Sequence, residues 1–156
     1  DDNCTHGRGP GCADAAYNMT LNWLKIGGRG IDTAFAYQNQ QQIGAAIKAS
    51  NIDPKSIFIT TKIMPTPCTQ EAALAAVKVD LQLLGLDQVD LMLQHFPCDS
   101  DSENEAVWAG LVQAKQQGLV RAIGVSHYSQ QQLEAITKAS SVKPSVNQCQ
   151  LSVGSH

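Results

Sequence analysis

The segment GRGIDTAFAYQNQQQIGAAIK, Gly28 to Lys48, combines a strand, a turn and the start of a helix. Residues 30–36 form a short apolar run that predicts a strand, and the apolar spacing of residues 43–47 predicts a helix after it. Two ionisable side chains, Asp32 and Tyr37, stand between the two elements. Their position raises the question of whether both belong to one catalytic site.

The alternation of strand and helix continues along the chain at intervals of roughly thirty residues, the size of a βαβ unit. Apolar spacing predicts helices that end near these residues: Gly27, Ser50, Gly85, Gly118 and Ile136. β-branched and apolar runs predict strands at 30–36, 56–63, 88–96, 120–128 and 145–152. Ser129 and Gln132 resemble a capping box that starts the last helix.

This alternation predicts a parallel sheet with right-handed crossovers. Two closures fit the pattern, an open doubly wound sheet or part of a (β/α)8 barrel. No GxGxxG motif follows a strand, which favours the barrel over a dinucleotide-binding open sheet. We expect an irregular or flexible tail at residues 1–14 and one domain at residues 15–156, because no low-complexity linker divides the elements.

Composition excludes several classes of protein. The formal net charge is −3, and the 11 Lys and Arg residues are scattered, whereas a nucleic-acid surface needs concentrated positive charge. No apolar run approaches the roughly 20 residues that a membrane helix needs. The polar beginning DDNCTHGRGPGC lacks the apolar region of a signal peptide.

The cysteines are odd in number and widely spread: Cys4, Cys12, Cys68, Cys98 and Cys149. This spacing is not typical of a disulfide framework, so we expect a reducing compartment, the cytoplasm or an organelle stroma. Cys4, His6 and Cys12 fit no zinc-binding spacing, and no metal site is predicted. A disulfide between Cys4 and Cys12 is the open alternative for this pair.

Four ionisable residues are expected where the first three strands end: Asp32, Tyr37, Lys62 and His95. Functional groups of parallel β/α folds gather at the carboxyl ends of the strands, and successive strands are commonly neighbours. These side chains could therefore meet at one rim. On residue type alone, each also has a structural explanation as a cap, a packed ring, a rim charge or a satisfied histidine.

The chemistry of such a cluster follows from its charges. A tyrosine with a pKa near 10 is a poor proton donor at neutral pH, and a nearby ammonium lowers that pKa by stabilising the phenolate. Asp32 would keep Lys62 charged, while a ring N–H of His95 would hold a carbonyl oxygen. The cluster suits protonation of an alkoxide as a hydride arrives, and the hydride must come from a nicotinamide or a flavin.

Five motifs together resemble the aldo-keto reductase family. They run in family order from about Tyr17 to Gln150: GRGIDTAFAYQN, ITTKI, LMLQHFP, VRAIGVSHYS and PSVNQCQ. The resemblance implies a (β/α)8 barrel that binds NADPH without a Rossmann fold. It also implies reduction of a small-molecule aldehyde or ketone to an alcohol.

Matched residue by residue, the family's catalytic tetrad falls on Asp32, Tyr37, Lys62 and His95, with Tyr37 as the general acid. Asp32 also lies at the cofactor, and the family's contacts to the nicotinamide fall on Ser126, His127 and Gln148. Two positions depart from the family pattern. His127 stands where Asn is usual, and Gln40 stands where Glu is usual.

By the same match, the chain holds strands two to six of eight. The first strand and the last two βα units, with the aromatic that stacks on nicotinamide and the loop that grips the adenosine phosphate, fall outside it. We therefore expect a partial barrel that this chain does not close alone. Two functions fit: an NADPH-dependent carbonyl reductase, or a catalytically silent relative whose open edges a protein partner covers.

Overall fold

The computed structural model describes residues 10–150, and its first helix begins earlier than expected. α1 (Pro10–Lys25) starts inside the range 1–14 that the sequence assigns to an irregular tail. Proline is tolerated in the first turn of a helix, where its missing N–H would have no acceptor, and the alanines that follow favour helix. Residues 1–9 and the side chain of Cys12 lie outside the described part of the chain.

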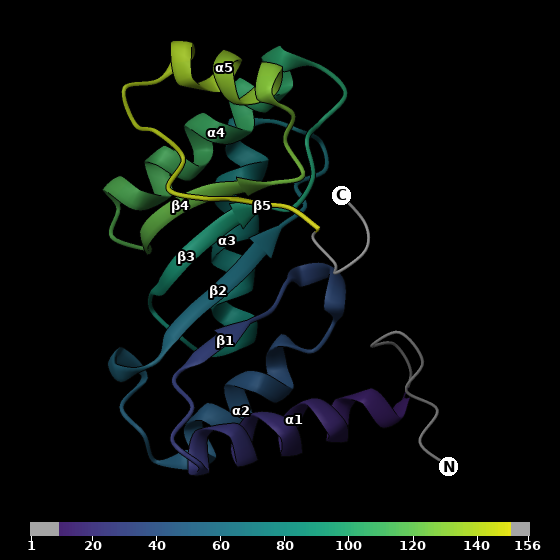
Figure 1. The fold of residues 1–156 in the computed structure, drawn as a ribbon, viewed down its shortest axis with the longest axis vertical. Coiled ribbons are helices and arrows are strands. Elements are labelled where there is room, and N and C mark those ends of the chain that lie inside the picture. The colour runs from purple at the N-terminus through teal and green to yellow at the C-terminus, as the bar shows by residue number, and fades with distance from the viewer. Residues whose placement is uncertain (1–9, 151–156) are drawn as a thin grey trace.

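Five strands form one parallel sheet in the order β1-β2-β3-β4-β5 (Figure 1). They are β1 (Gly30–Asp32), β2 (Phe58–Ile63), β3 (Val89–Gln94), β4 (Val120–Ser126) and β5 (Asn147–Gln148). Each strand lies beside the next one in the chain, as in a barrel, without the reversal of order that marks a doubly wound sheet. The predicted partial (β/α)8 barrel is confirmed.

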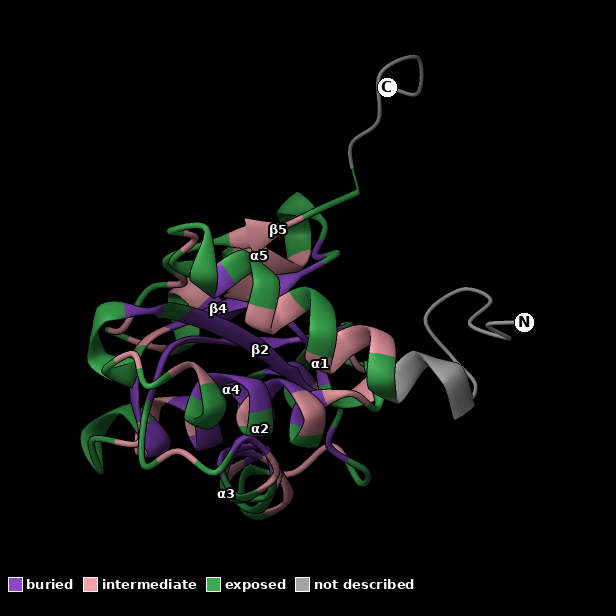
Figure 2. Cartoon of the chain, turned by 90° about the horizontal axis from the view of Figure 1, so that it is seen from below, coloured by how far each residue is buried: buried purple, intermediate pink, exposed green. Residues whose placement is uncertain are grey.

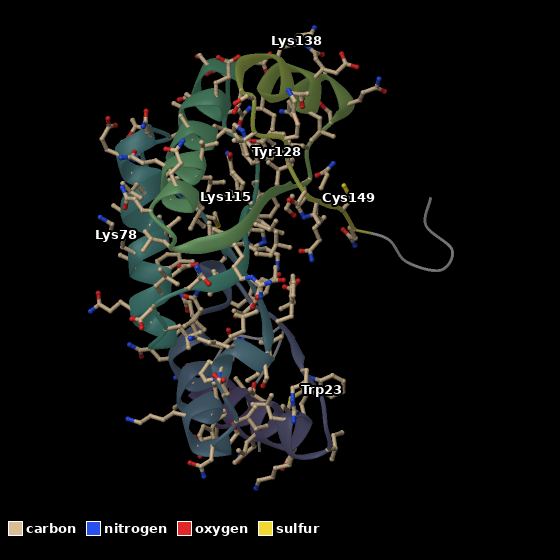
Figure 3. The ribbon with its side chains drawn as sticks, turned by 90° about the vertical axis from the view of Figure 1, so that its left-hand side faces the viewer. Trp23, Lys78, Lys115, Tyr128, Lys138 and Cys149 are labelled. Carbon is tan, nitrogen blue, oxygen red and sulfur yellow. A yellow bond between two sulfur atoms is a disulfide. The ribbon has the colours of Figure 1, made fainter. Side chains whose placement is uncertain are left out.

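Helices connect the strands and cover one side of the sheet. They are α2 (Gln40–Ser50), α3 (Gln70–Leu84), α4 (Asp101–Gln116) and α5 (Gln130–Ala139). Figures 1 and 3 show α3 and α4 on one side of the strands, with α1 and α2 at one end and α5 at the other. The opposite side of the sheet carries no helix of the described residues.

The helix starts follow their capping chemistry. The Ser129 hydroxyl accepts from the Gln132 amide, and the Gln132 side chain accepts from the Ser129 amide, which confirms the predicted capping box. Ser100 and Glu103 form a second box at the start of α4.

The core lies between the sheet and the helices, where Figure 2 shows the buried residues. Strand residues such as Ile59, Met92 and Ile123 pack against helix residues such as Val77 and Trp108, all almost fully buried. The alternating strand faces explain this: in β2, the residues on either side of Thr61 point the other way. One face of the sheet thus packs in the core beneath the helices, and the other face is the side without a helix.

Two strands are shorter than the sequence predicts. The expected strand at 30–36 ends at Asp32, because the chain turns into the 3-10 helix η1 (Phe35–Tyr37) and Gln38 adopts a left-handed conformation. The expected strand at 145–152 contains only Asn147–Gln148, and 151–152 lie outside the described residues. Within 10–150, β1 pairs only with β2 and β5 only with β4. An open half-barrel follows.

Candidate functional site

All five strands deliver a polar side chain to the same rim. Asp32 ends β1, Lys62 is the next-to-last residue of β2, and His95 follows β3 directly. Ser126 ends β4 and Gln148 ends β5, and these two are register partners. Because the sheet is parallel throughout, the predicted site residues come from one end of it.

Lys62 is the most buried charge of the cluster. Its side chain is 2% exposed, and its ammonium donates to Asp32 Oδ1 and, at 3.1 Å, to the backbone oxygen of Thr33. A buried ammonium without partners would be very costly. The carboxylate and the carbonyl therefore hold Lys62 in one place, as the predicted Asp–Lys pair requires.

Tyr37 lies beside this ion pair at the end of η1. The Lys62 ammonium is 5.2 Å from the centroid of the Tyr37 ring. Tyr37 is 38% exposed, so it is partly open to solvent while it lies beside the buried ammonium.

His95 completes the predicted four. Its ring meets the Tyr37 ring edge-on, with 5.6 Å between the centroids. Burial, and then the charge of Lys62 and the neighbouring His127, lower the pKa of His95 below its ordinary value, while Asp32 opposes them. The imidazole is therefore neutral at pH 7. Its buried Nδ1 has no hydrogen-bond partner among the described residues.

Gln148 joins the last strand to the first across the open side of the half-barrel. Its side-chain amide donates to Asp32 Oδ2 at 2.7 Å, although 116 residues separate the two. The Ser126 hydroxyl donates to the Gln148 backbone oxygen at 2.7 Å. Gln148 thus contacts the Asp32–Lys62 pair directly, and Ser126 is connected to it through the Gln148 backbone.

His127 adopts a left-handed conformation with φ 59°, a region that asparagine enters more readily than histidine does. Its ring stacks on Phe96 with 5.0 Å between centroids, and Phe96 stacks on His95 at 4.5 Å. Sequence reasoning missed Phe96. Its only signal is its place between His95 and Pro97, which does not distinguish a packed ring from a rim ring.

A buried polar network behind the site was also missed. Gln40 donates to Thr61 Oγ1 at 2.8 Å, and Thr61 Oγ1 donates to Asp80 Oδ2 at 3.0 Å. Burial raises the pKa of Asp80 to about 6, and side-chain hydrogen bonding with Gln40 and Thr61 opposes this rise. The network joins α2, β2 and α3 directly behind Lys62, and helical spacing alone gives no sign of a buried carboxyl on α3.

The cysteine expectation needs a correction. Cys68 and Cys98 form a disulfide, whereas the sequence suggested reduced thiols. They are 30 residues apart in the chain. They meet because the loops after β2 and β3 come together at the rim, and the spacing of the cysteines does not reveal this proximity. Cys149 is free and exposed. The predicted compartment and the state of Cys4 and Cys12 stay predictions.

Two expected absences concern the described residues alone. Over residues 10–150, no cluster of three or more His, Cys, Asp or Glu residues is arranged to hold a metal ion. In the same range, no helix has the length and apolar character that crossing a membrane requires.

The curled parallel sheet with its polar rim defines a protein of the β/α-barrel class. The family model described as "Aldo/keto reductase family" matches residues 5–156. The chain belongs to the aldo/keto reductase family. It is similar to an aldo-keto reductase of Mycobacterium marinum, with 40% identity over 128 residues, 82% of this chain and 46% of the relative.

Solved structures give the same answer. An aldo/keto reductase from Brucella melitensis has a TM-score of 0.85 and 38% identity, over 89% of this chain and 54% of that chain. A Bombyx mori aldo-keto reductase in complex with NADP has a TM-score of 0.83 and 28% identity, over 96% and 52%. The chain spans about half the length of the relatives it matches.

Proposed function

We propose that this chain carries the proton-transfer half of an NADPH-dependent carbonyl reductase. The observation that supports the proposal most is the position of the Lys62 ammonium. It is paired with the Asp32 carboxylate and lies 5.2 Å from the Tyr37 ring centroid. A neutral His95 stands edge-on to the same ring. Together these groups can position a carbonyl and protonate its oxygen.

In this reaction the Tyr37 hydroxyl gives its proton to the substrate oxygen, and Lys62 stabilises the phenolate that remains. Asp32 holds the Lys62 ammonium in place through their ion pair. A ring N–H of His95 holds the carbonyl oxygen of a small-molecule aldehyde or ketone. In the reverse direction, the Tyr37 phenolate takes the proton of an alcohol.

NADPH would supply the hydride when bound. Ser126, His127 and Gln148 would hold the nicotinamide amide, and Asp32 would border it. The donor set fits an amide, because a hydroxyl, an imidazole and a carboxamide offer both donors and acceptors there. The three residues are linked at the rim through the Gln148 backbone oxygen, which accepts from the Ser126 hydroxyl at 2.7 Å and from the His127 backbone N–H at 3.1 Å.

Two observations favour the second candidate, a catalytically silent relative that binds a protein partner. Gln148 donates to Asp32 Oδ2, so a proposed cofactor contact is engaged with a proposed catalytic residue. The outer edges of β1 and β5 also lack a paired strand within the described residues. Unpaired edges are places where another polypeptide can add a strand.

Turnover separates the two candidates. The 156 residues are assayed alone and as a chimera in which the Mycobacterium marinum relative supplies the barrel units outside the matched region, with an aromatic aldehyde and NADPH oxidation followed by absorbance. We expect the chimera to turn over. A chimera that binds NADPH, seen by nicotinamide fluorescence, but reduces no aldehyde would favour the silent relative instead.

A further inference from the structure

The Cys68–Cys98 disulfide connects two loops that leave the sheet at the proposed site. Cys68 lies between β2 and α3, and Cys98 lies between β3 and α4. Lys62 and His95 stand where these two loops begin. Both cysteines are half-buried rather than part of the closed core, and exchange requires access of a thiol from solution to one of their sulfur atoms.

Cys98 is built into a polar network with a buried centre. The Cys98 amide donates to Asn104 Oδ1 at 2.7 Å, and the Gln94 side chain donates to Cys98 Sγ at 3.3 Å. Tyr128 anchors the network with its hydroxyl 2.7 Å from Gln94 Oε1. Figure 3 shows Tyr128 in the interior and Cys149 at the surface. This network ties the second loop to β3 and α4, whereas the disulfide ties it to the loop after β2.

The surroundings of the two sulfurs suit the reduced state as well. A Cys68 thiol would have an acceptor in the Pro65 backbone oxygen, 3.8 Å from its sulfur. Cys98 keeps the donated hydrogen bond from Gln94 when it becomes a thiol. Reduction therefore leaves neither sulfur among apolar groups alone, so the loops can exist in both states.

The disulfide state bears on the ring stack over the site. Phe96 lies two residues before Cys98, and its backbone oxygen accepts from Gln94 at 3.1 Å. The Phe96 ring lies between His95 and His127 in the stack. A bond that holds Cys98 to the neighbouring loop restricts this segment, and its loss lets the segment move relative to β2.

We propose that Cys68 and Cys98 are a thiol–disulfide exchange site that controls the Phe96 ring between His95 and His127. The reductant is a dithiol, small or protein-borne. One of its thiolates attacks a sulfur of the pair, the Cys68–Cys98 bond breaks, and a mixed disulfide forms. The second thiol then displaces the cysteine. Cys68 and Cys98 gain two electrons and two protons, and the dithiol becomes a disulfide.

The test uses the 156-residue chain with Cys4, Cys12 and Cys149 replaced by serine, so that one pair remains. The protein is equilibrated in mixtures of oxidised and reduced dithiothreitol, trapped with N-ethylmaleimide and analysed by peptide mass. Carbon-bound ring protons of His95 and His127 are followed by NMR in the same mixtures, and far-UV circular dichroism records the fold. A further Cys68→Ser/Cys98→Ser variant is the control.

We expect Cys68 and Cys98 to gain the label together in one reversible transition, with two labels per reduced chain. The ring signals of His95 and His127 shift on reduction and return on reoxidation, while the far-UV spectrum is unchanged. The serine variant gives the reduced pattern in every mixture.

Three results would overturn the proposal: both cysteines labelled in the oxidised mixture, ring signals that ignore the redox state, or loss of helix on reduction. The last would make the bond a structural link required for folding. None of these measurements involves turnover, so they stand whether or not the proposed reductase activity does.

Discussion

At the scale of single residues, the candidate site depends on the placement of one ammonium. The Lys62 side chain is 2% exposed, and its contacts to Asp32 and Thr33 fix its position beside Tyr37. The sequence could place Asp32, Tyr37, Lys62 and His95 at the strand ends. It could not show that Phe96 and His127 would stack on His95, because ring contacts depend on the loop conformations that bring residues 96 and 127 together.

The first prediction concerns the charge that Lys62 places next to His95. Lys62→Met removes one cause of the lowered His95 pKa, so the NMR titration midpoint of His95 rises towards its ordinary value of 6.5. In the unchanged protein the midpoint lies below 6.5. Lys55→Met removes the same charge from η2 (Pro54–Ser56), at the other end of β2. An equal rise of the His95 midpoint in both variants would contradict a direct effect of the Lys62 charge on His95.

The second prediction concerns pH and Asp80. Burial raises its pKa from an ordinary value of 3.8 to about 6, so the folded chain binds an extra proton between these two values. The free energy of unfolding therefore falls as pH rises through this window, by up to about 3 kcal/mol. Asp80→Asn removes this loss. Its stability relative to the unchanged chain should rise from about pH 4 to pH 7.

Chemical denaturation at several pH values measures this difference. Asp87→Asn removes a carboxyl from the exposed segment before β3 and serves as the control. A stability difference for Asp80→Asn that stays constant with pH would show that Asp80 does not carry the effect.

At the scale of elements, the pattern of strands and helices was predictable, and its ends were not. Apolar periodicity gave the central strands and the helices because their faces are buried against one another. β1 ends early because Thr33 turns the chain and its backbone oxygen accepts from Lys62, a partner 29 residues away. The Cys68–Cys98 contact likewise depends on two loops meeting in space.

The third prediction concerns the close contact of α2 and α3. A Cβ atom added to Gly44 would lie 2.2 Å from the backbone oxygen of Leu84. Gly→Ala inside a helix gains up to about 1 kcal/mol of propensity, but overpacking costs about 1–3 kcal/mol and the clash is with backbone. Gly44→Ala should therefore lower the melting temperature. Gly30→Ala, whose added Cβ meets nothing within 4 Å, should not.

The fourth prediction concerns the stability that the disulfide supplies. A bond that closes a loop of 30 residues lowers the entropy of the unfolded chain, which stabilises the folded chain by about 3–4 kcal/mol in the chain-entropy description. Cys68→Ser/Cys98→Ser should lower the free energy of unfolding by about that amount without unfolding the chain. Cys149→Ser, at a free and exposed position, is the matched control. Equal free energies of unfolding for the Cys68→Ser/Cys98→Ser variant and the unchanged chain would contradict the presence of the disulfide.

At the scale of the whole molecule, the half-barrel places the site residues but does not enclose them. The alternation of elements predicted the five-stranded parallel sheet, and the observed order β1-β2-β3-β4-β5 agrees with it. The contact of Gln148 with Asp32, from the last strand to the first, could not be predicted. It depends on how far the sheet curls, which local sequence patterns do not encode.

The most direct test of the central claim is the effect of Tyr37→Phe on aldehyde reduction in the chimera with a completed barrel. If Tyr37 is the general acid, kcat should fall by about 10²–10⁴-fold, while Tyr17→Phe, on α1, leaves it unchanged. The melting temperature should stay the same, because Tyr37 is 38% exposed and is not part of the buried core. Equal turnover by the Tyr37→Phe variant would contradict the account.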